Sequence, residues 1–213
     1  MTDTPAQYAL YWSKGTASIL PQMIMEEAGI ACRIVPVDLA GGENRKPEFL
    51  AKNPDGTVPV LELPDGGFVS ETGAICLYLI EVHGLNNLAP PVDDPLRGAF
   101  LQWLFYHSNR LQPSYKHYYY PERYAPDLSQ IEEMRKKAID LILDAWQPVE
   151  QHLSSGGPNH LGDRFSMLDL SLAMLVTWFP DPENLLERMP AVERCYRLVT
   201  ARPAAGKCMG IQA

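Results

Sequence analysis

The sequence predicts an α/β domain followed by an all-helical domain, within a chain of 213 residues. Runs that favour β-strands occur only early in the chain, where they alternate with helical stretches. A polar, proline-rich stretch comes next, and beyond it only helical periodicity remains. We therefore expect an α/β domain over residues 1–84, a linker over residues 85–95 and an all-helical domain over residues 96–213.

The elements of the α/β domain follow from hydrophobic periodicity and from the glycines and prolines that bound each run. Gly29 and Gly84 close two helices, and Pro64-Asp65-Gly66 marks a hairpin turn. Pro36 indicates an edge strand, because proline cannot donate a hydrogen bond to a sheet ladder. The expected elements are, in order, a strand at residues 8–12, a helix at 19–28, a strand at 34–37, a short helix at 46–50, strands at 60–63 and 67–69, and a helix at 72–83.

The second domain shows helical periodicity alone. Ser166 and Asp169 fit a capping box, in which the serine caps the helix and the acidic residue bonds back to the serine backbone. The expected helices cover residues 96–111, 128–153, 167–179 and 185–201.

Charge and cysteine content exclude several classes of protein. The formal net charge of −8 argues against a nucleic-acid partner, whose phosphates require a basic surface. Cys32, Cys76, Cys195 and Cys208 lie far apart, with neither a C-x-x-C pair nor metal-ligand spacing. We therefore expect reduced thiols, no metal and a cytoplasmic location. No run approaches the ~18 apolar residues of a membrane span, so no membrane partner is expected.

The stretch NPDGTVPVLEL, residues 53–63, combines a turn with the start of an apolar strand. Pro59 indicates an edge or loop position, and a cis bond after Val58 would expose the Val58 backbone to an extended peptide. Glu71 and Thr72 follow at the start of a helix, where backbone N–H groups attract a carboxylate. This combination suits a small peptide that carries a carboxylate, such as glutathione.

Four motifs together cover nearly the full length of the chain: LYWSKGTASILPQMIMEEAG, KPEFLAKNPDGTVPVLEL, SETGAICLYLIE and GDRFSMLDLSL. In this order and spacing they resemble the cytosolic glutathione transferase superfamily, in its bacterial form, between the beta-like and the theta- or delta-like patterns. The resemblance implies an N-terminal thioredoxin-like domain followed by a C-terminal helical-bundle domain. It also implies glutathione as co-substrate, a small hydrophobic electrophile as second substrate, and a homodimer.

The resemblance assigns the glutathione-binding residues. The residue before the cis-proline pairs with the backbone of glutathione in this family, and the matching residues are Val58 and Pro59. By the same match, Glu71 would hold the γ-glutamyl ammonium, and Thr72 with the helix N-terminus would hold the α-carboxylate. Asn44 lies where relatives carry a group near the glycyl carboxylate, although a plain turn residue fits equally well. In a simpler interpretation, Thr72 caps the helix and Glu71 favours its dipole.

Catalysis by such an enzyme requires the glutathione thiol to ionise. Lowering the thiol pKa from ~8.5 by about two units takes only ~2.7 kcal/mol of preferential stabilisation. The candidate hydroxyl donors are Thr16, Ser18 and Ser13. When the chain is aligned with delta and theta members of the family, Thr16 occupies the position of their catalytic serine. When it is aligned with beta members, Ala17 occupies the position of their catalytic cysteine, and Ser18 follows it. Disulfide exchange through a loop cysteine is therefore not expected, and Ser18 is alternatively a helix N-cap.

For the electrophile, the family places a pocket beside the first helices of the second domain. The implied residues are Tyr106, Arg110, Tyr115 and Tyr119, whose rings and polar tips suit such a pocket. Core packing or a dimer seam is the alternative, and His107 is expected on the helix surface. The sequence leaves three functions open: glutathione conjugation, glutathione binding without turnover, and glutathione-dependent isomerisation or dehalogenation.

Overall fold

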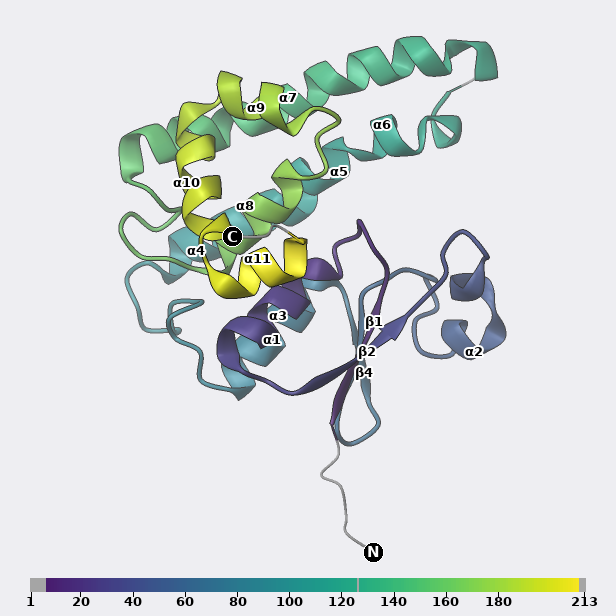
Figure 1. Ribbon diagram of the computed structural model, residues 1–213, viewed down its shortest axis with the longest axis vertical. Coiled ribbons are helices and arrows are strands. Elements are labelled where there is room, and N and C mark those ends of the chain that lie inside the picture. The colour runs from purple at the N-terminus through teal and green to yellow at the C-terminus, as the bar shows by residue number, and fades with distance from the viewer. Residues whose placement is uncertain (1–6, 126, 211–213) are drawn as a thin grey trace, which may run out of the picture. The chain divides into compact units, whose positions relative to one another are not determined.

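The protein consists of two compact units, each with its own buried core. The structure, a computed structural model, describes residues 7–125 and 127–210. The first unit joins residues 7–88 to residues 202–210, and the second takes residues 89–201. Figure 1 shows a sheet with helices in the first unit and helices alone in the second. The predicted fold class, α/β and then all-helical, is confirmed.

The first unit is built on a four-stranded mixed sheet with strand order β2-β1-β3-β4. β1 runs parallel to β2 and antiparallel to β3, which is antiparallel to β4. β2 lies at an edge of the sheet, as Pro36 predicted. The strands are β1 (Tyr8–Trp12), β2 (Cys32–Pro36), β3 (Val60–Glu62) and β4 (Phe68–Ser70).

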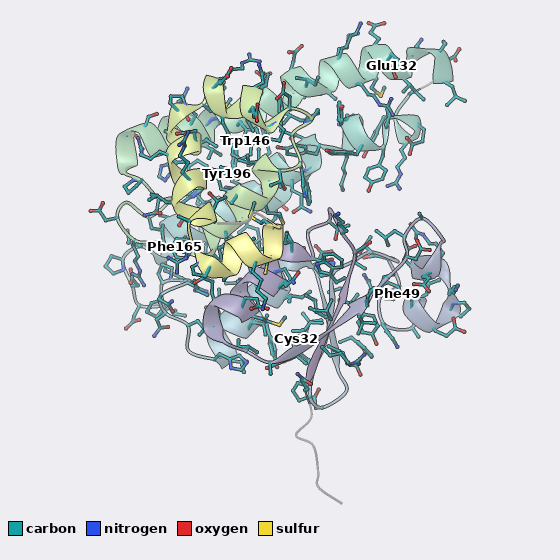
Figure 2. All side chains as sticks on the ribbon, in the orientation of Figure 1. Cys32, Phe49, Glu132, Trp146, Phe165 and Tyr196 are labelled. Carbon is teal, nitrogen blue, oxygen red and sulfur yellow. The ribbon has the colours of Figure 1, made fainter. Side chains whose placement is uncertain are left out.

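Helices lie on both sides of this sheet (Figure 1). α1 and α3 pack against each other on one side, and α2 lies on the other. On the α2 side, Phe49, labelled in Figure 2, forms a small core with Val37 and Val60. The elements are α1 (Ile19–Ala28), the 3₁₀ turn η1 (Glu43–Arg45), α2 (Pro47–Leu50) and α3 (Thr72–Val82).

The helix α11 (Pro203–Met209) packs on α1 and so belongs to the first unit. The sequence predicted it in the second domain, at residues 96–213. Arg202 donates two hydrogen bonds to the carboxylate of Glu27, at 2.8 and 2.7 Å, and Lys207 binds Glu26. Because Glu26 and Glu27 look like an ordinary solvated helix face in the sequence, nothing local predicted this contact.

The second unit surrounds one fully buried helix. Every residue of α8 is buried, which is the pattern of a central helix. Figure 2 marks Trp146 of α7 and Tyr196 of α10 in this unit. The helices are α4 (Arg97–Tyr106), the π-helical turn η2 (His107–Leu111), α5 (Gln112–Ser114), α6 (Lys116–Tyr119), the 3₁₀ turns η3 (Pro121–Arg123) and η4 (Leu128–Gln130), α7 (Ile131–Gly156), α8 (Met167–Val176), α9 (Pro182–Arg188) and α10 (Pro190–Thr200).

Two predicted helices differ from the structure in their continuity, and a proline lies at each change. The helices predicted at residues 128–153 and 167–179 differ only at their ends, since α7 covers Ile131–Gly156 and α8 covers Met167–Val176. The helix expected at residues 96–111 continues beyond Leu111 through a π-helical turn, just before Pro113, which cannot donate to the carbonyl four residues back. The helix expected at residues 185–201 is two helices, because α10 begins at Pro190. Proline fits the first turn of a helix, where its missing N–H costs nothing.

Among the described residues, no helix combines the length and the apolar character that spanning a membrane requires.

Candidate functional site

Three segments that the sequence singled out meet at the edge of the sheet where β1 and β4 end, which is called the sheet edge from here on. Tyr11 of β1 lies opposite Val60 of β3, and Val60 lies opposite Ser70 of β4. Because β1 and β4 both run antiparallel to β3, their C-terminal ends lie at the same edge, about 10 Å apart across two strand spacings. The loop after β1, the segment Val58–Pro59 before β3 and the segment Glu71–Thr72 after β4 are therefore neighbours.

Two helix N-termini open on this edge without a side-chain cap. α1 begins after Ser18 and α3 after Glu71, and neither side chain bonds to the N–H groups of the first turn. Among the described helices, Ser166 caps α8 and Asp181 caps α9, whereas α4, α7, α10 and α11 also begin without a side-chain cap. Unpaired N–H groups and the helix dipole give an N-terminus a partial positive charge. This edge can therefore bind anionic groups, even in a chain with a net charge of −8.

Glu71 has a backbone conformation that glutamate rarely adopts. Its φ is +69°, the single positive value among the described non-glycine residues. Such a conformation costs of order 1–3 kcal/mol and is found preferentially at functional sites. The side chain is exposed, and Glu71 itself holds the N-cap position without a side-chain hydrogen bond. Thr72 is the first helical residue and not the cap, so the simpler capping interpretation does not match the structure.

The loop before β3 is held by side chains that bond to its backbone. The Val58–Pro59 peptide bond is cis. Asn44 Nδ2 donates to the Gly56 carbonyl at 2.6 Å, and Asn53 Nδ2 donates to the Thr57 carbonyl at 2.8 Å. Gly56 has a φ of +62°, and a Cβ there would lie 2.8 Å from the Asn44 carbonyl oxygen, so only glycine fits. Asn44 thus supports the loop with one of its two amide hydrogens.

The loop between β1 and α1 brings two hydroxyls into contact. Thr16 Oγ1 and Ser18 Oγ are 2.8 Å apart, and Thr16 Oγ1 also donates to the Ser13 carbonyl at 2.7 Å. Ser18 is completely buried, whereas Thr16 and Ser13 are half-buried. Ser18 holds the N-cap position of α1, as the alternative from the sequence predicted, but its side chain makes no capping hydrogen bond. Ala17, at the position of a catalytic cysteine, offers no reactive group.

The cysteines of this chain are poor nucleophiles where they lie. Burial raises the pKa of Cys32 and of Cys208 to about 11, and it raises the pKa of Cys76 and of Cys195 even further. The thiolate is the reactive form of a thiol, and a free cysteine has a pKa of ~8.5. Thiol chemistry in this protein therefore needs a thiol that a ligand brings.

The residues predicted for the electrophile pocket do not line one common hollow. Tyr115 is only 2% exposed, and its hydroxyl donates to the Leu175 carbonyl at 2.8 Å. Tyr115 is a core residue of the helical unit, so its prediction as a pocket residue is wrong. Tyr106 is half-buried and donates to a backbone carbonyl of α7 at 2.9 Å. Arg110 is exposed on the π-helical turn η2.

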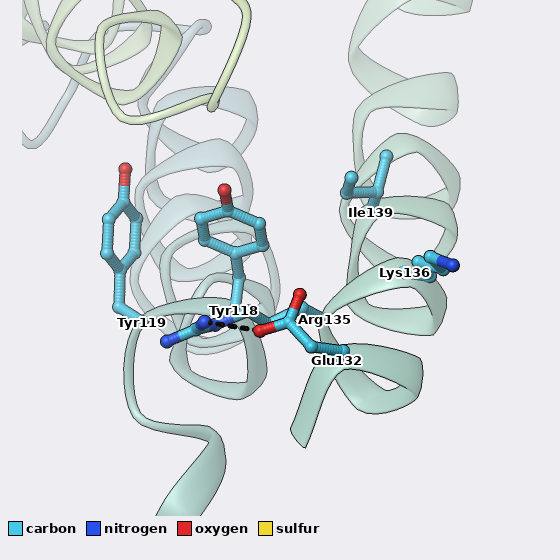
Figure 3. Close-up of a pocket in the computed structure, with 6 residues that line it drawn as sticks. All are labelled: Tyr118, Tyr119, Glu132, Arg135, Lys136 and Ile139. Atoms are coloured by element: carbon cyan, nitrogen blue, oxygen red, sulfur yellow. Dashed lines mark hydrogen bonds and ion pairs between the residues drawn. The ribbon is translucent and has the colours of Figure 1, made fainter. Parts of the chain in front are cut away.

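Tyr119 does line a hollow, of about 380 Å³, between α6 and α7 (Figure 3). The rings of Tyr118 and Tyr119 lie on one side at an interplanar angle of 81°. A hollow of this size is in the range that small molecules occupy. It combines aromatic, aliphatic and cationic surface, because its lining residues are Tyr118, Tyr119, Glu132, Arg135, Lys136 and Ile139.

A buried chain of hydrogen-bonded polar side chains in the helical unit was not predicted from the sequence. His107 Nδ1 lies 3.0 Å from Ser171 Oγ, and His107 Nε2 lies 3.1 Å from His160 Nε2. His160 Nδ1 lies 2.9 Å from an Asp169 oxygen. His107 is 2% exposed, so the expectation of a surface histidine is wrong. Its partners lie 53 and 64 positions along the chain, so no local pattern pointed to them.

Each ring nitrogen in this chain of contacts has a hydrogen-bond partner. His160 donates from Nδ1 to the Asp169 carboxylate. In neutral His107, one of the nitrogens that face Ser171 and His160 donates and the other accepts. Burial, followed by the neighbouring His160, lowers the pKa of His107 well below its usual value.

The same region offers a set of metal-type ligands. Ligand atoms of His160, Asp169 and Cys195 lie within 4.8 Å of one another, and zinc accepts these residue types. The Asp169 oxygens, however, already accept from the N–H groups of His160 and Ser166, at 2.9 and 2.8 Å. The predicted capping box of Ser166 and Asp169 is confirmed. We therefore interpret the group as a hydrogen-bonded core.

Comparisons with known sequences agree with this geometry. A family model described as "Glutathione S-transferase, N-terminal domain" matches residues 21–82. Among curated relatives, the disulfide-bond oxidoreductase YfcG of Escherichia coli (strain K12) is 28% identical over 200 residues. The matched segment covers 88% of this chain and 87% of YfcG.

Solved structures match almost the whole chain. A glutathione transferase homologue from Sulfitobacter with bound glutathione has a TM-score of 0.85 at 27% identity, covering 97% of this chain and 100% of that chain. A glutathione transferase from Methylococcus capsulatus strain Bath has a TM-score of 0.80 at 29% identity, covering 95% and 97%. The similarity therefore extends over both units.

Proposed function

We propose that the chain is a member of the glutathione transferase superfamily, that it binds glutathione at the sheet edge of its first unit, and that it activates the thiol for attack on a small hydrophobic electrophile. The observation that carries this proposal is the convergence of two uncapped helix N-termini with the cis Val58–Pro59 segment and the strained Glu71. The family match and the glutathione-bound structure of a similar protein support it.

Each part of the tripeptide has a partner at this edge. The Val58 backbone pairs with the cysteinyl residue of glutathione, Glu71 holds the γ-glutamyl ammonium, and Thr72 with the N-terminus of α3 holds the α-carboxylate. Asn44 keeps one amide hydrogen for the glycyl carboxylate. The strain at Glu71 favours a binding role over simple capping, because a helix start gains nothing from a positive φ at a glutamate.

Thiol activation falls to Thr16 and the N-terminus of α1. A hydrogen bond to a charged group contributes about 1.5–3 kcal/mol, and a lowering of the thiol pKa by about two units requires ~2.7 kcal/mol. One hydroxyl donor together with the helix dipole is therefore sufficient. Thr16 is half-buried and within reach of a ligand, whereas Ser18 is completely buried.

The electrophile falls to the helical unit, with the hollow at Tyr119 as its candidate pocket. Its aromatic rings suit an apolar substrate, and Lys136 can stabilise negative charge on it. Replacing Tyr119 by alanine should raise the KM for the electrophile and leave the Kd for glutathione unchanged. By the family resemblance, we further propose a cytoplasmic homodimer.

A second candidate function is glutathione-dependent disulfide reduction, which the similarity to the oxidoreductase YfcG favours. The raised pKa values of all four cysteines mean that bound glutathione would be the attacking thiol. Its thiolate attacks one sulfur of a disulfide and expels the other as a thiolate. A second glutathione then attacks the mixed disulfide, which releases glutathione disulfide and the second thiol.

Thiolate absorbance of bound glutathione, titrated against pH, tests the step that both reactions share. We expect the bound thiol to ionise about two units below ~8.5, and ionisation at the free value would contradict thiol activation. Parallel rates with chlorodinitrobenzene and with hydroxyethyl disulfide then separate conjugation from disulfide reduction. Glutathione binding without turnover of either compound would favour a non-catalytic binding protein.

A further inference from the structure

We propose that Ser18 is a positioning residue for Thr16: its hydroxyl donates to Thr16 Oγ1 and so makes Thr16 a dedicated donor toward the glutathione thiolate. The inference rests on the proposed function, because it concerns the same site. Thr16 and Ser18 then have separate roles: Thr16 contacts the thiolate, and Ser18 acts through Thr16.

The contacts around Thr16 Oγ1 fix the direction of each hydrogen bond. The Ser13 carbonyl can only accept, so the 2.7 Å contact uses the single hydroxyl hydrogen of Thr16. The 2.8 Å contact between the two hydroxyl oxygens is then donated by Ser18. The backbone N–H of Ser18 approaches the same Thr16 oxygen at 3.3 Å. Thr16 Oγ1 thus accepts from two donors, which is its full capacity, and the remaining interaction open to it is donation.

Burial separates the two roles. Ser18 is 0% exposed, so in this conformation a ligand sulfur cannot contact its hydroxyl. Thr16 is half-buried, and its hydrogen can leave the Ser13 carbonyl by rotation about one C–O bond. An anionic sulfur attracts this hydrogen more strongly than a neutral carbonyl does. The Ser18 hydroxyl hydrogen can follow this change, because it too turns about a single C–O bond.

Donation from Ser18 strengthens the bond that Thr16 makes. Hydrogen bonds in a chain polarise one another, so an oxygen that accepts a hydrogen becomes a better donor of its own. Without the Ser18 hydroxyl, Thr16 Oγ1 regains a free lone pair and its hydrogen loses a fixed direction. If the two residues merely held the loop together, removing the hydroxyl of Ser18 would change stability or glutathione affinity but not the pKa of the bound thiol.

The test is the pKa of bound glutathione, measured by thiolate absorbance at saturating glutathione, in the full-length protein and its variants. Ser18→Ala should raise this pKa by about half a unit, the value of a modest hydrogen bond. Thr16→Ala should raise it more, and the double variant should match Thr16→Ala alone, since Ser18 acts through Thr16. Thr16→Ser keeps the hydroxyl and should retain most of the shift. Ser155→Ala removes an exposed hydroxyl of α7 and serves as the matched control.

The outcomes distinguish the positioning role from the proposed function. An unshifted thiol in the wild-type protein would overturn both. A shifted wild-type thiol that Ser18→Ala leaves unchanged would overturn the positioning role alone, as would a Ser18→Ala effect that persists in the Thr16→Ala background. Glycine is tolerated at an N-cap, so Ser18→Gly provides a second variant should Ser18→Ala fail to fold, with the same expected rise.

Discussion

Acidification should destabilise the helical unit through His107. This imidazole is buried and neutral in the folded protein, and burial holds its pKa well below the usual value. In the unfolded chain the same group has a pKa of ~6.5. Below that pH the unfolded chain takes up a proton that the folded protein does not. The contribution of neutral His107 to stability is therefore complete above pH ~6.5 and is lost as the pH falls.

The size of the effect follows from one proton. Each pH unit well below ~6.5 should cost about 1.4 kcal/mol for as long as folded His107 stays neutral, which gives about 2 kcal/mol at about pH 5. Urea unfolding from about pH 8 to about pH 5, followed by tryptophan fluorescence, measures the free energy of unfolding. Trp103 and Trp146 lie buried in the helical unit, so their signal reports on this unit.

The variant His107→Gln isolates this contribution. It should be less stable than the wild-type protein at about pH 8, because the contacts to Ser171 and His160 are disturbed. Between pH ~6.5 and about pH 5, the free energy of unfolding of the variant should fall by about 2 kcal/mol less than that of the wild-type protein. His83→Gln, at an exposed histidine whose Nε2 lies 3.2 Å from Tyr8 Oη, gives a comparison variant in the first unit. Equal slopes in wild type and His107→Gln would refute the reasoning.

Three further predictions concern strain, a core hydroxyl and an ion pair. Glu71→Gly should raise the free energy of unfolding by about 1 kcal/mol, because it relieves a positive φ, and yet weaken glutathione binding; unchanged binding would contradict the role of Glu71. Tyr115→Phe should destabilise the helical unit by about 1–3 kcal/mol, because it removes two buried hydrogen bonds and leaves Trp146 Nε1 without its acceptor. A changed KM for the electrophile would restore Tyr115 as a pocket residue. Arg202→Ala should cost about 1 kcal/mol and increase hydrogen exchange in α1, where Glu27 loses its bidentate partner; unchanged exchange would show that α11 does not stabilise α1.

Much of the fold could be predicted because its signals are local. The strand at residues 8–12 and the helix at residues 19–28 have the bounds of β1 and α1, since periodicity and Gly29 mark them directly. The predictions failed where the evidence lies far along the chain. α11 packs against α1 through Arg202 and Glu27, which are 175 positions apart, and no pattern around either residue reveals the other.

The site divides in the same way. Pro59 and Glu71 stand out in the sequence because proline and helix-start residues have fixed conformational meaning. The direction of the Thr16 hydroxyl could not be predicted from the sequence, because it depends on a loop backbone that places the Ser13 carbonyl within hydrogen-bond distance of Thr16 Oγ1. The burial of Tyr115 was also hidden, because an aromatic residue suits a pocket and a core equally well, and only its distant partners decide.

The residue proposed to bind the γ-glutamyl end of glutathione and the residue proposed to activate its thiol lie at opposite ends of the sheet edge. Glu71 follows β4, whereas Thr16 follows β1, about 10 Å away across two strand spacings. In the proposed complex, Glu71 and Thr16 contact different parts of the tripeptide. Glu71→Gln should therefore weaken glutathione binding without moving the pKa of the bound thiol. Thr16→Ala should raise that pKa, and by linkage it should also raise the Kd at a pH above the bound pKa; well below it, where the thiol is protonated in the free and the bound state, the Kd should stay unchanged. A moved pKa in Glu71→Gln, or a raised Kd for the protonated thiol in Thr16→Ala, would mean that the two ends are coupled through the bound tripeptide.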